Sequence, residues 1–154
     1  MILLDSDVLL IAHRYQNDPR YSVNDQTLQQ LRTDAISLGI SAQALLEIVG
    51  ILSFNVPKAS VSRLPHFLIG LHGLIVFPDV QQFPDYAGCT VGELIAQMAH
   101  QMSLPDAVQA VQIARYAGHA DCLLTWNARH FQGKLVIPVL TPQEWLAQHD
   151  TGNP

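Results

Sequence analysis

Short apolar runs alternate along the chain with longer stretches in which apolar residues recur at helical spacing. The runs cover residues 2–4, 74–77, 122–125 and 135–139, and a shorter one lies at residues 39–41. Runs of this length predict buried strands, and the stretches between them are long enough for helices. The alternation therefore predicts an α/β protein with a mostly parallel central sheet of about five short strands.

Capping and helix-breaking residues indicate where the helices begin and end. Residues 141–144 read Thr-Pro-Gln-Glu, a capping box with proline at the first helical position, and predict a short last helix through Gln148. Six other helices are expected. One starts at Val8, and five start after Pro19 and Asn24, at Ser41, after Pro57, at Thr90 and at Pro105, with ends near Gly39, Leu52, Gly70, Met102 and Gly118.

Composition limits the classes of protein that fit. The chain has 154 residues, 49% of them hydrophobic, which predicts one domain over residues 1–150 and a frayed tail at 151–154. Only 14% of the residues are charged and the net charge is −5, so the chain lacks the broad basic surface that binds nucleic acid non-specifically. A phosphate-bearing substrate would need local help, which divalent cations bound to carboxylates can supply.

The sequence also indicates a cytoplasmic protein. No apolar stretch is long enough to span a bilayer, and the N-terminal run is interrupted by acids and lacks the basic start of a signal peptide. Cys89 and Cys122 are not arranged as a disulfide framework or a CxxC site. The seven histidines lack metal-ligand spacing, so zinc is not expected. We expect a soluble protein in a reducing compartment, without membrane contact.

Two aspartates stand where the first strand ends. Asp5 and Asp7 follow the apolar run at residues 2–4, and an acid at the carboxyl end of a buried strand lies at the crevice where ligands bind. Capping of the following helix is the alternative, because Asp is a favoured N-cap. One cap is enough, whereas two acids are present, so the pair favours a site for a cation or a phosphate.

Two further acids extend this series. Glu47 lies in a helix that is otherwise apolar around most of its circumference, where an unpaired carboxylate is costly, although a narrow polar stripe with Gln43 explains it equally well. Asp106 opens the helix after Pro105, where the helix dipole by itself favours an anion. Neither residue is decisive alone, but with Asp5 they form a set of acids that an α/β fold can bring together.

Three blocks of the chain carry these acids. The first reads Asp5-Ser6-Asp7-Val8-Leu9, the second, at residues 41–47, reads Ser-x-x-x-Leu-x-Glu, and the third is Asp106 with the alanine-rich helix behind it. Residues 118–131 and the ending at 139–146 complete the pattern. In their order and spacing, these blocks resemble the PIN-domain ribonucleases, especially the VapC-like toxins of bacterial toxin–antitoxin pairs. The resemblance covers nearly the whole chain.

The resemblance implies a PIN-like three-layer α/β/α sandwich and the activity of a metal-dependent endoribonuclease. Asp5, Glu47 and Asp106 would be the acidic ligands of Mg²⁺ or Mn²⁺, which prefer hard oxygen ligands. A metal-activated water would attack the phosphodiester of an RNA substrate. The resemblance also implies a small antitoxin protein as partner and a homodimer. The apolar residues 49–54 and the helix after Pro57 are either a surface for such a partner or part of the core.

One expected catalytic position departs from the family pattern. Many members carry Asp at the position of Asn127, and Asn keeps an oxygen ligand but removes a negative charge, so a second cation would be held more weakly. Asp7 is a better supporting ligand than Asp121, for which a capping or surface role is expected. Ser6 and Thr125 are hydroxyls at strand ends that orient waters or carboxylates, or else serve only as turn residues.

Three residues near the acidic blocks are candidates for contact with a nucleic acid. Arg14 and Arg129 are the best candidates for phosphate contact, although most lone arginines are simply solvated. Trp126 is a candidate for stacking on a base, and the alternative is an ordinary packing role beside a strand end.

Two other functions remain open from the sequence. Asp5-x-Asp7 resembles the nucleophile and acid pair of haloacid-dehalogenase-like phosphatases, but Leu9 stands where those enzymes usually have Thr. The second alternative is a PIN domain that binds RNA or a protein partner without cleavage, which Asn127 and the acidic net charge favour. Phosphatase activity on a small ester would identify the first, and binding without metal-dependent cleavage would identify the second.

Overall fold

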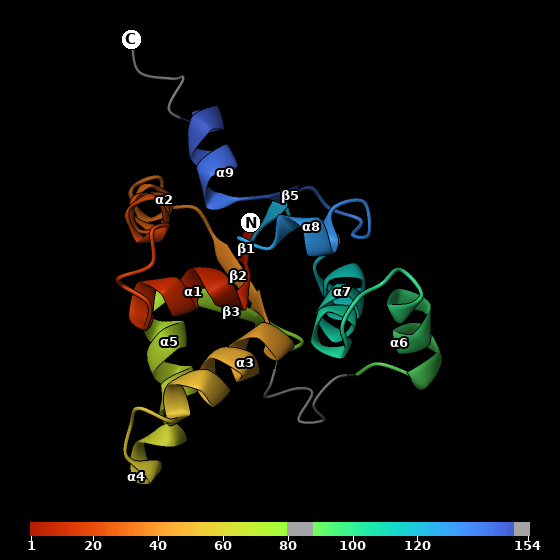
Figure 1. Cartoon of the computed structure of the whole chain (residues 1–154), viewed down its shortest axis with the longest axis horizontal. Coiled ribbons are helices and arrows are strands. Elements are labelled where there is room, and N and C mark those ends of the chain that lie inside the picture. The colour runs from red at the N-terminus through yellow and green to blue at the C-terminus, as the bar shows by residue number, and fades with distance from the viewer. Residues whose placement is uncertain (80–87, 150–154) are drawn as a thin grey trace.

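A five-stranded parallel sheet forms the centre of the molecule (Figure 1). The computed structural model describes residues 1–79 and 88–149. The strands run in the order β3-β2-β1-β4-β5, so the order reverses between the central strands β1 and β4. This arrangement confirms the predicted α/β class, and the sheet is parallel throughout. The strands are β1 (Ile2–Leu4), β2 (Leu38–Ser41), β3 (Leu74–Phe77), β4 (Cys122–Leu124) and β5 (Val139–Leu140).

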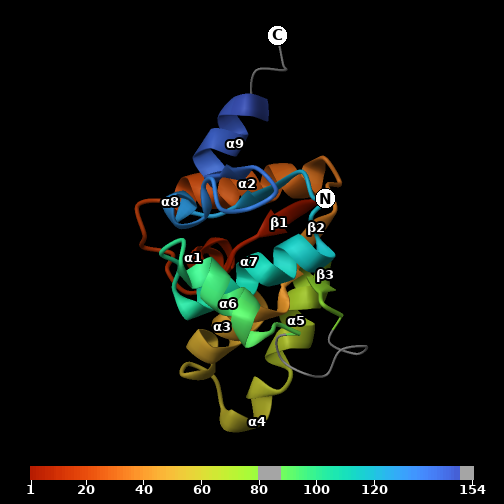
Figure 2. The same cartoon turned by 90° about the vertical axis from the view of Figure 1, so that its right-hand side faces the viewer.

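Helices cover both faces of the sheet and give the molecule three layers (Figures 1 and 2). The helices of one face are α1 (Ser6–His13), α2 (Tyr21–Thr33), α3 (Ala42–Ser53), α5 (Leu64–His72) and α9 (Pro142–His149). The other face is covered by α7 (Leu104–Tyr116) and α8 (Ala128–Phe131), with α6 (Val91–Met98) packed against α7. The short α4 (Lys58–Val61) follows α3 at the edge of the molecule.

Each face of the sheet has its own hydrophobic core. Ile2 and Leu4 of β1 lie in the core beneath α1, α2 and α3, whereas Leu3 lies in the core beneath α7 and α8. This alternation follows from the strand geometry, because successive side chains point to opposite faces. All three residues are almost completely buried, which explains why this strand has no polar position.

Proline explains two differences from the predicted elements. The helix expected after Pro57 is divided into α4 and α5, because Pro65 lies in the first turn of α5, where it lacks an N–H and its ring would clash with the carbonyl of Val61 in a continuous helix. The strand expected at residues 135–139 is reduced to Val139 and Leu140, which pair with β4, because Pro138 cannot donate to the ladder.

Other helix boundaries also differ from the sequence-based expectations. The helix α2 ends at Thr33 and α6 ends at Met98, each before a residue with a left-handed backbone conformation, Ala35 (φ 51°) and Gln101 (φ 59°). A helix cannot continue through such a residue. The predicted capping box of α9 is present, since the carboxylate of Glu144 accepts from the backbone N–H of Thr141 at 2.7 Å.

The described residues bear on the expectations about membrane-spanning segments and about disulfide bonds. No helix among them is long and apolar enough to cross a membrane. Neither Cys89 nor Cys122 forms a disulfide bond within the described residues. The tail expected at residues 151–154 lies outside the described part of the chain.

Candidate active site

The two central strands end side by side at the edge of the sheet where the strand order reverses. Leu4 of β1 lies opposite Leu124 of β4, so Asp5 and Thr125 follow the two strands as neighbours. The backbone N–H of Asp5 donates to the carbonyl of Leu124 at 3.0 Å. Open α/β sheets bind their ligands at reversals of this kind, outside the carboxyl ends of the strands.

Asp5 is buried and hydrogen-bonded from three elements. Its Oδ2 accepts from the hydroxyl of Thr125 at 2.7 Å, and its Oδ1 accepts from the backbone N–H of Ser6 at 2.7 Å and from the side-chain amide of Gln109 at 3.2 Å. Burial raises the pKa of Asp5 and the charge of Asp106 adds to this effect, while the three hydrogen bonds lower it. Asp5 is also the N-cap of α1, so the capping role foreseen as an alternative is present together with the contacts to Thr125 and Gln109.

Asp7 points toward the end of β4 as well. Its Oδ2 accepts from the backbone N–H of Trp126 at 2.9 Å and lies 3.2 Å from the hydroxyl of Thr125. Its Oδ1 is buried and has no hydrogen-bond partner among the described residues. Burial, followed by the negative charge of Asp5, raises the pKa of Asp7 to about 8.

Glu47 reaches the same site from α3. The hydroxyl of Ser6 donates to its Oε2 at 2.9 Å, which links α3 to the start of α1. Burial raises the pKa of Glu47, and the charges of Asp5 and Asp106 raise it further. The helix therefore presents this carboxylate to the other acids, rather than only to a polar stripe on the surface.

Asp106 approaches from the first turn of α7. Its backbone N–H donates to the hydroxyl of Ser103, the N-cap of the helix, at 3.3 Å. The Nδ1 atom of His130, on α8, lies 3.5 Å from Oδ2 of Asp106. Because the charge of Asp106 acts on both Asp5 and Glu47, the three acids foreseen as metal ligands form one electrostatic group.

The donor set of this group fits Mg²⁺ or Mn²⁺ in its chemistry. All of the donors are hard carboxylate oxygens. Burial, followed by repulsion between neighbouring carboxylates, raises the pKa values of Asp5, Asp7 and Glu47, and Oδ1 of Asp7 lacks a hydrogen bond within the described structure. Among residues 1–79 and 88–149, however, no three acidic, histidine or cysteine side chains lie close enough to hold an ion directly. Mg²⁺ keeps several waters and binds through one or two carboxylates, so direct contact with three is not required.

The remaining candidate residues differ in where they lie relative to this group, and Asp121 is at the opposite ends of β1 and β4. Asn127 is exposed, and its backbone N–H donates to the hydroxyl of Thr125 at 3.0 Å, while its side chain makes no hydrogen bond to the described residues. Asp121 is on the surface, where it pairs with the amino group of Met1. Arg129 is exposed and has no ion pair or hydrogen bond in the described chain. Arg14 donates to a backbone carbonyl at 3.0 Å.

Sequence reasoning missed Gln109. This residue is buried on α7 and its amide binds Asp5, although 104 positions separate the two. The available signal was a polar residue in an apolar helix, three positions after Asp106 and therefore on the same helix face. Asn24 was missed for a similar reason, since it is buried on α2 and accepts from the indole N–H of Trp126 at 2.9 Å.

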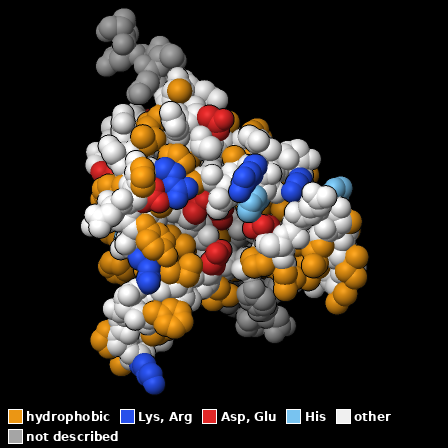
Figure 3. All heavy atoms as spheres, in the orientation of Figure 1, with side chains coloured by type: hydrophobic (Ala, Val, Ile, Leu, Met, Phe, Trp, Pro, Cys, Tyr) orange, Lys and Arg blue, Asp and Glu red, His pale blue; other side chains and the backbone are white. Residues whose placement is uncertain are grey.

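Asp5 is buried, but Glu47 is exposed and Asp106 is partly exposed, so part of the acidic group reaches the surface of the molecule. On the face shown in Figure 3, acidic side chains gather near the middle, with Lys and Arg side chains around them. Such a distribution offers carboxylates for a cation at the centre and positive charges for an anionic polymer at the rim. The net charge of −5 is thus compatible with local contacts to phosphate.

Comparison with known proteins identifies the fold. One chain of VapBC2 from Rickettsia felis, whose crystal structure was determined with a DNA fragment from their promoter, is similar with a TM-score of 0.60. The match covers 92% of this chain and 98% of the other, at 19% sequence identity. The chain has a PIN-like fold. No family model and no curated protein sequence matches it.

The PIN-like fold agrees with the architecture expected from the sequence. The predicted three-layer α/β/α sandwich is confirmed, and the similarity extends along nearly the whole of both chains. The TM-score of 0.60 supports the shared fold, and at 19% identity the similarity shows the fold alone. The roles of individual residues follow instead from their contacts in this chain.

Proposed function

We propose that this protein is a metal-dependent endoribonuclease that hydrolyses RNA phosphodiester bonds. The observation that carries the proposal is Asp5, a buried acid at the strand-order reversal, which three donors orient and whose charge acts on Glu47. Carboxylates that share a site and repel one another are stabilised by a bound cation. Such a group in a PIN-like fold supports a nuclease better than it supports a structural role.

The cofactor in this proposal is Mg²⁺ or Mn²⁺, held by Asp5, Glu47 and Asp106 with Asp7 in support. When bound, the ion lowers the pKa of a water molecule and screens the charge of the phosphate. Thr125 and Gln109 hold the Asp5 carboxylate in one orientation. Ser6 does the same for Glu47. Asn127 and Arg129 lie at the rim, where an amide oxygen and a guanidinium are available to waters or phosphates.

We further propose that the protein is the toxin of a toxin–antitoxin pair and forms a homodimer. The similar VapBC2 chain belongs to a complex of that kind. A groove of about 570 Å³ lies between α1, the end of α3 and α5, and Phe67 on its wall is 57% exposed. Phe54, which precedes the groove residue Asn55 in the chain, is 87% exposed, so the apolar surface foreseen in this region is not all core. Exposed aromatic side chains beside a groove support a protein partner.

Cleavage of a mixed RNA panel by the purified protein tests the nuclease directly. The substrates are single-stranded and tRNA-like RNAs in Mg²⁺ or Mn²⁺, with EDTA and Asp5→Asn as negative controls. Asp34→Asn is the matched control, because Asp34 is an exposed acid on the end of α2, hydrogen-bonded to Gln30. We expect cleavage that EDTA and Asp5→Asn abolish and that Asp34→Asn leaves unchanged.

Two other outcomes would contradict the proposal and identify an alternative. Intact RNA in every condition, together with RNA binding by the folded protein, would identify a PIN domain that binds without cleavage. The exposure of Asn127 and the separation of the acids favour this second function. Hydrolysis of p-nitrophenyl phosphate that depends on Asp5, without RNA cleavage, would identify the phosphatase.

A further inference from the structure

We infer that Trp126 and Arg20 form a stacking platform for an unpaired base of an RNA strand whose backbone passes the acidic site. The inference rests on the proposed function, since it names the part of the substrate that is recognised beside the site of cleavage. Aromatic rings and guanidinium planes are the groups on which unpaired bases stack in proteins that bind RNA.

The plane of the Trp126 ring is held in place. Its indole N–H donates to Oδ1 of Asn24 at 2.9 Å, and the amide of Asn24 donates to the carbonyl of Val8 at 2.9 Å. Asn24 lies on α2 and is completely buried, and Val8 lies on α1, so the two hydrogen bonds link the ring to both helices. Trp126 itself remains partly exposed. A partly exposed ring that is already oriented loses little freedom when it receives a base.

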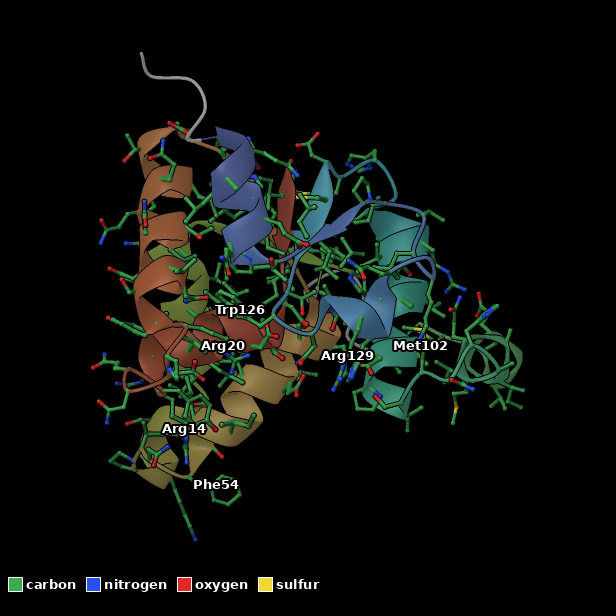
Figure 4. The ribbon with its side chains drawn as sticks, turned by 45° about the horizontal axis from the view of Figure 1, so that its top comes forward. Arg14, Arg20, Phe54, Met102, Trp126 and Arg129 are labelled. Atoms are coloured by element: carbon green, nitrogen blue, oxygen red, sulfur yellow. The ribbon has the colours of Figure 1, made fainter. Side chains whose placement is uncertain are left out.

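The guanidinium of Arg20 is oriented over this ring. Its central carbon lies 5.6 Å from the centroid of Trp126. Two parallel hydrogen bonds to Asp18, at 2.9 and 2.7 Å, fix its plane, and the side chain is still 46% exposed. Figure 4 shows Arg20 beside Trp126. The pair therefore offers two planar groups, one aromatic and one cationic, within one small area.

The pair is directly connected to the acidic site. The backbone N–H of Trp126 donates to Asp7, and the residue before it, Thr125, donates to Asp5. A base on the platform would therefore lie next to the nucleotide whose phosphate faces the acids. In Figure 4, Arg129 lies on α8, away from the Arg20–Trp126 pair. It has no ion pair within the described residues, so it is available to a flanking phosphate.

These features favour an unpaired strand over a duplex. A base must leave its neighbours to stack on a protein ring, which costs least in a single strand or a loop. The net charge of −5 gives the protein little general attraction to the phosphate backbone, so local stacking has to supply part of the affinity. Stacking is tolerant of sequence because every base has a π-face.

Binding of a labelled single-stranded RNA in EDTA tests the platform without cleavage. Trp126→Leu removes the ring and the bond to Asn24, whereas Trp126→Phe removes that bond and keeps a smaller aromatic ring. Both keep the backbone N–H that binds Asp7. Phe54→Leu is the control for loss of an exposed aromatic residue. We expect Trp126→Leu to weaken binding about tenfold and Trp126→Phe and Phe54→Leu to stay within about threefold. A blunt RNA duplex should bind more weakly than the single strand, and none of the three substitutions should change its affinity.

Arg20→Lys extends the test, because it keeps the charge and removes the planar group. We expect it to weaken single-strand binding severalfold, whereas Arg63→Lys, at the exposed start of α5, should have no effect. In the wild type, RNA should quench the fluorescence of Trp126, since the other tryptophan, Trp145, is only 1% exposed. Circular dichroism verifies that each variant is folded.

The results separate this inference from the proposed nuclease. An equal loss of affinity for single-stranded RNA in Trp126→Leu and Trp126→Phe would overturn the platform, because the loss of the hydrogen bond to Asn24 would then account for both results. Binding by Trp126→Leu at the wild-type level, with RNA still cut in Mg²⁺, would also overturn it and leave the nuclease intact. Ring-dependent binding with no cleavage in any metal would support the platform and contradict the nuclease.

Discussion

The hydroxyl of Thr125 lies 2.7 Å from Oδ2 of Asp5, across 120 positions of the sequence. The hydroxyl oxygen of Thr125 also accepts from the backbone N–H of Asn127 at 3.0 Å and lies 3.2 Å from Oδ2 of Asp7. A hydroxyl has one proton to donate, and the shorter contact is to Asp5. The longer contact is to Oδ2 of Asp7, an acid whose pKa is raised to about 8, first by burial and then by the charge of Asp5. Thr125 thus contacts two acids of the site, and its hydrogen bond lowers the pKa of Asp5 more than any other contact does.

Removal of the Thr125 hydroxyl should shift the pH dependence of cleavage. In Thr125→Val, Asp5 loses the hydrogen bond that lowers its pKa most, so its pKa rises and a higher pH is needed to ionise it. We expect the acidic limb of the pH–rate profile to move to higher pH by about one unit, with rates near neutral pH reduced about tenfold. Thr125→Ser restores the hydroxyl and should restore the profile. Identical profiles for the valine variant and the wild type would contradict this role.

Gln109 should act as a positioning residue for Asp5. We expect Gln109→Leu to reduce cleavage several-fold and to move the acidic limb of the profile upward, because an amide that favours the ionised carboxylate is lost. Gln112→Leu is a matched control on the same helix, since Gln112 is equally buried but accepts from the backbone of Gln43. The control should lower the melting temperature without moving the profile. If both variants shift the profile equally, the effect is one of packing.

Asp7 should make the folded protein less stable as the pH rises. Its pKa is about 8 in the folded state and 3.8 ordinarily, so between these values the folded state binds more protons than the unfolded state. The free energy of unfolding therefore falls as the pH increases through this window. Asp7→Asn cannot ionise, so its stability relative to the wild type should increase from pH 5 to pH 8.5 by about 1.4 kcal/mol or more, which corresponds to one pKa unit.

Urea denaturation in metal-free buffer at both pH values measures this difference. Asp34→Asn is the control, because Asp34 is exposed and the stability of that variant relative to the wild type should not depend on pH in this range. A constant difference between Asp7→Asn and the wild type from pH 5 to pH 8.5 would mean that Asp7 is ionised throughout.

His72 should have the opposite dependence on pH. Its Nε2 lies 2.8 Å from Nε2 of His13, and the guanidinium of Arg32 lies 3.1 Å from its Nδ1. Arg32 can only donate, so Nδ1 of His72 accepts and its Nε2–H donates to His13. Burial, followed by the charges of His13 and Arg32, lowers the pKa of His72 to about 4. Protonation would remove this arrangement.

The unfolded state binds more protons at His72 between its ordinary pKa of 6.5 and about 4. The wild type should therefore lose stability as the pH falls through that window. His72→Gln lacks this proton uptake. The free energy of unfolding of this variant should therefore be lower than that of the wild type at pH 7, and the difference should shrink by about 1 kcal/mol or more at pH 5. Thermal or urea unfolding at both pH values measures it, with His119→Gln as the exposed control. A deficit that does not change with pH would contradict a neutral, buried His72.

Some parts of the fold and the site were within reach of sequence reasoning. Strand β1, the capping of α9 by Thr141 and Glu144, and the position of Asp5 at a strand end follow from patterns spanning a few residues. The ends of α2 and α6 could not be predicted in this way. The two helices end shortly before Ala35 and Gln101, which adopt left-handed conformations that no local sequence pattern predicts.

The sequence by itself determined the alternation of strands and helices, and therefore the α/β class, because periodicity and capping depend on neighbours within about one turn or two strand residues. Only the tertiary structure decided that Gln109 and Thr125 would meet at Asp5 and that Trp126 would bind Asp7. These contacts join segments more than 100 positions apart, and they depend on the order of strands in the sheet. Hydrophobic periodicity says which face of an element is buried, but it carries no information about which element lies beside it.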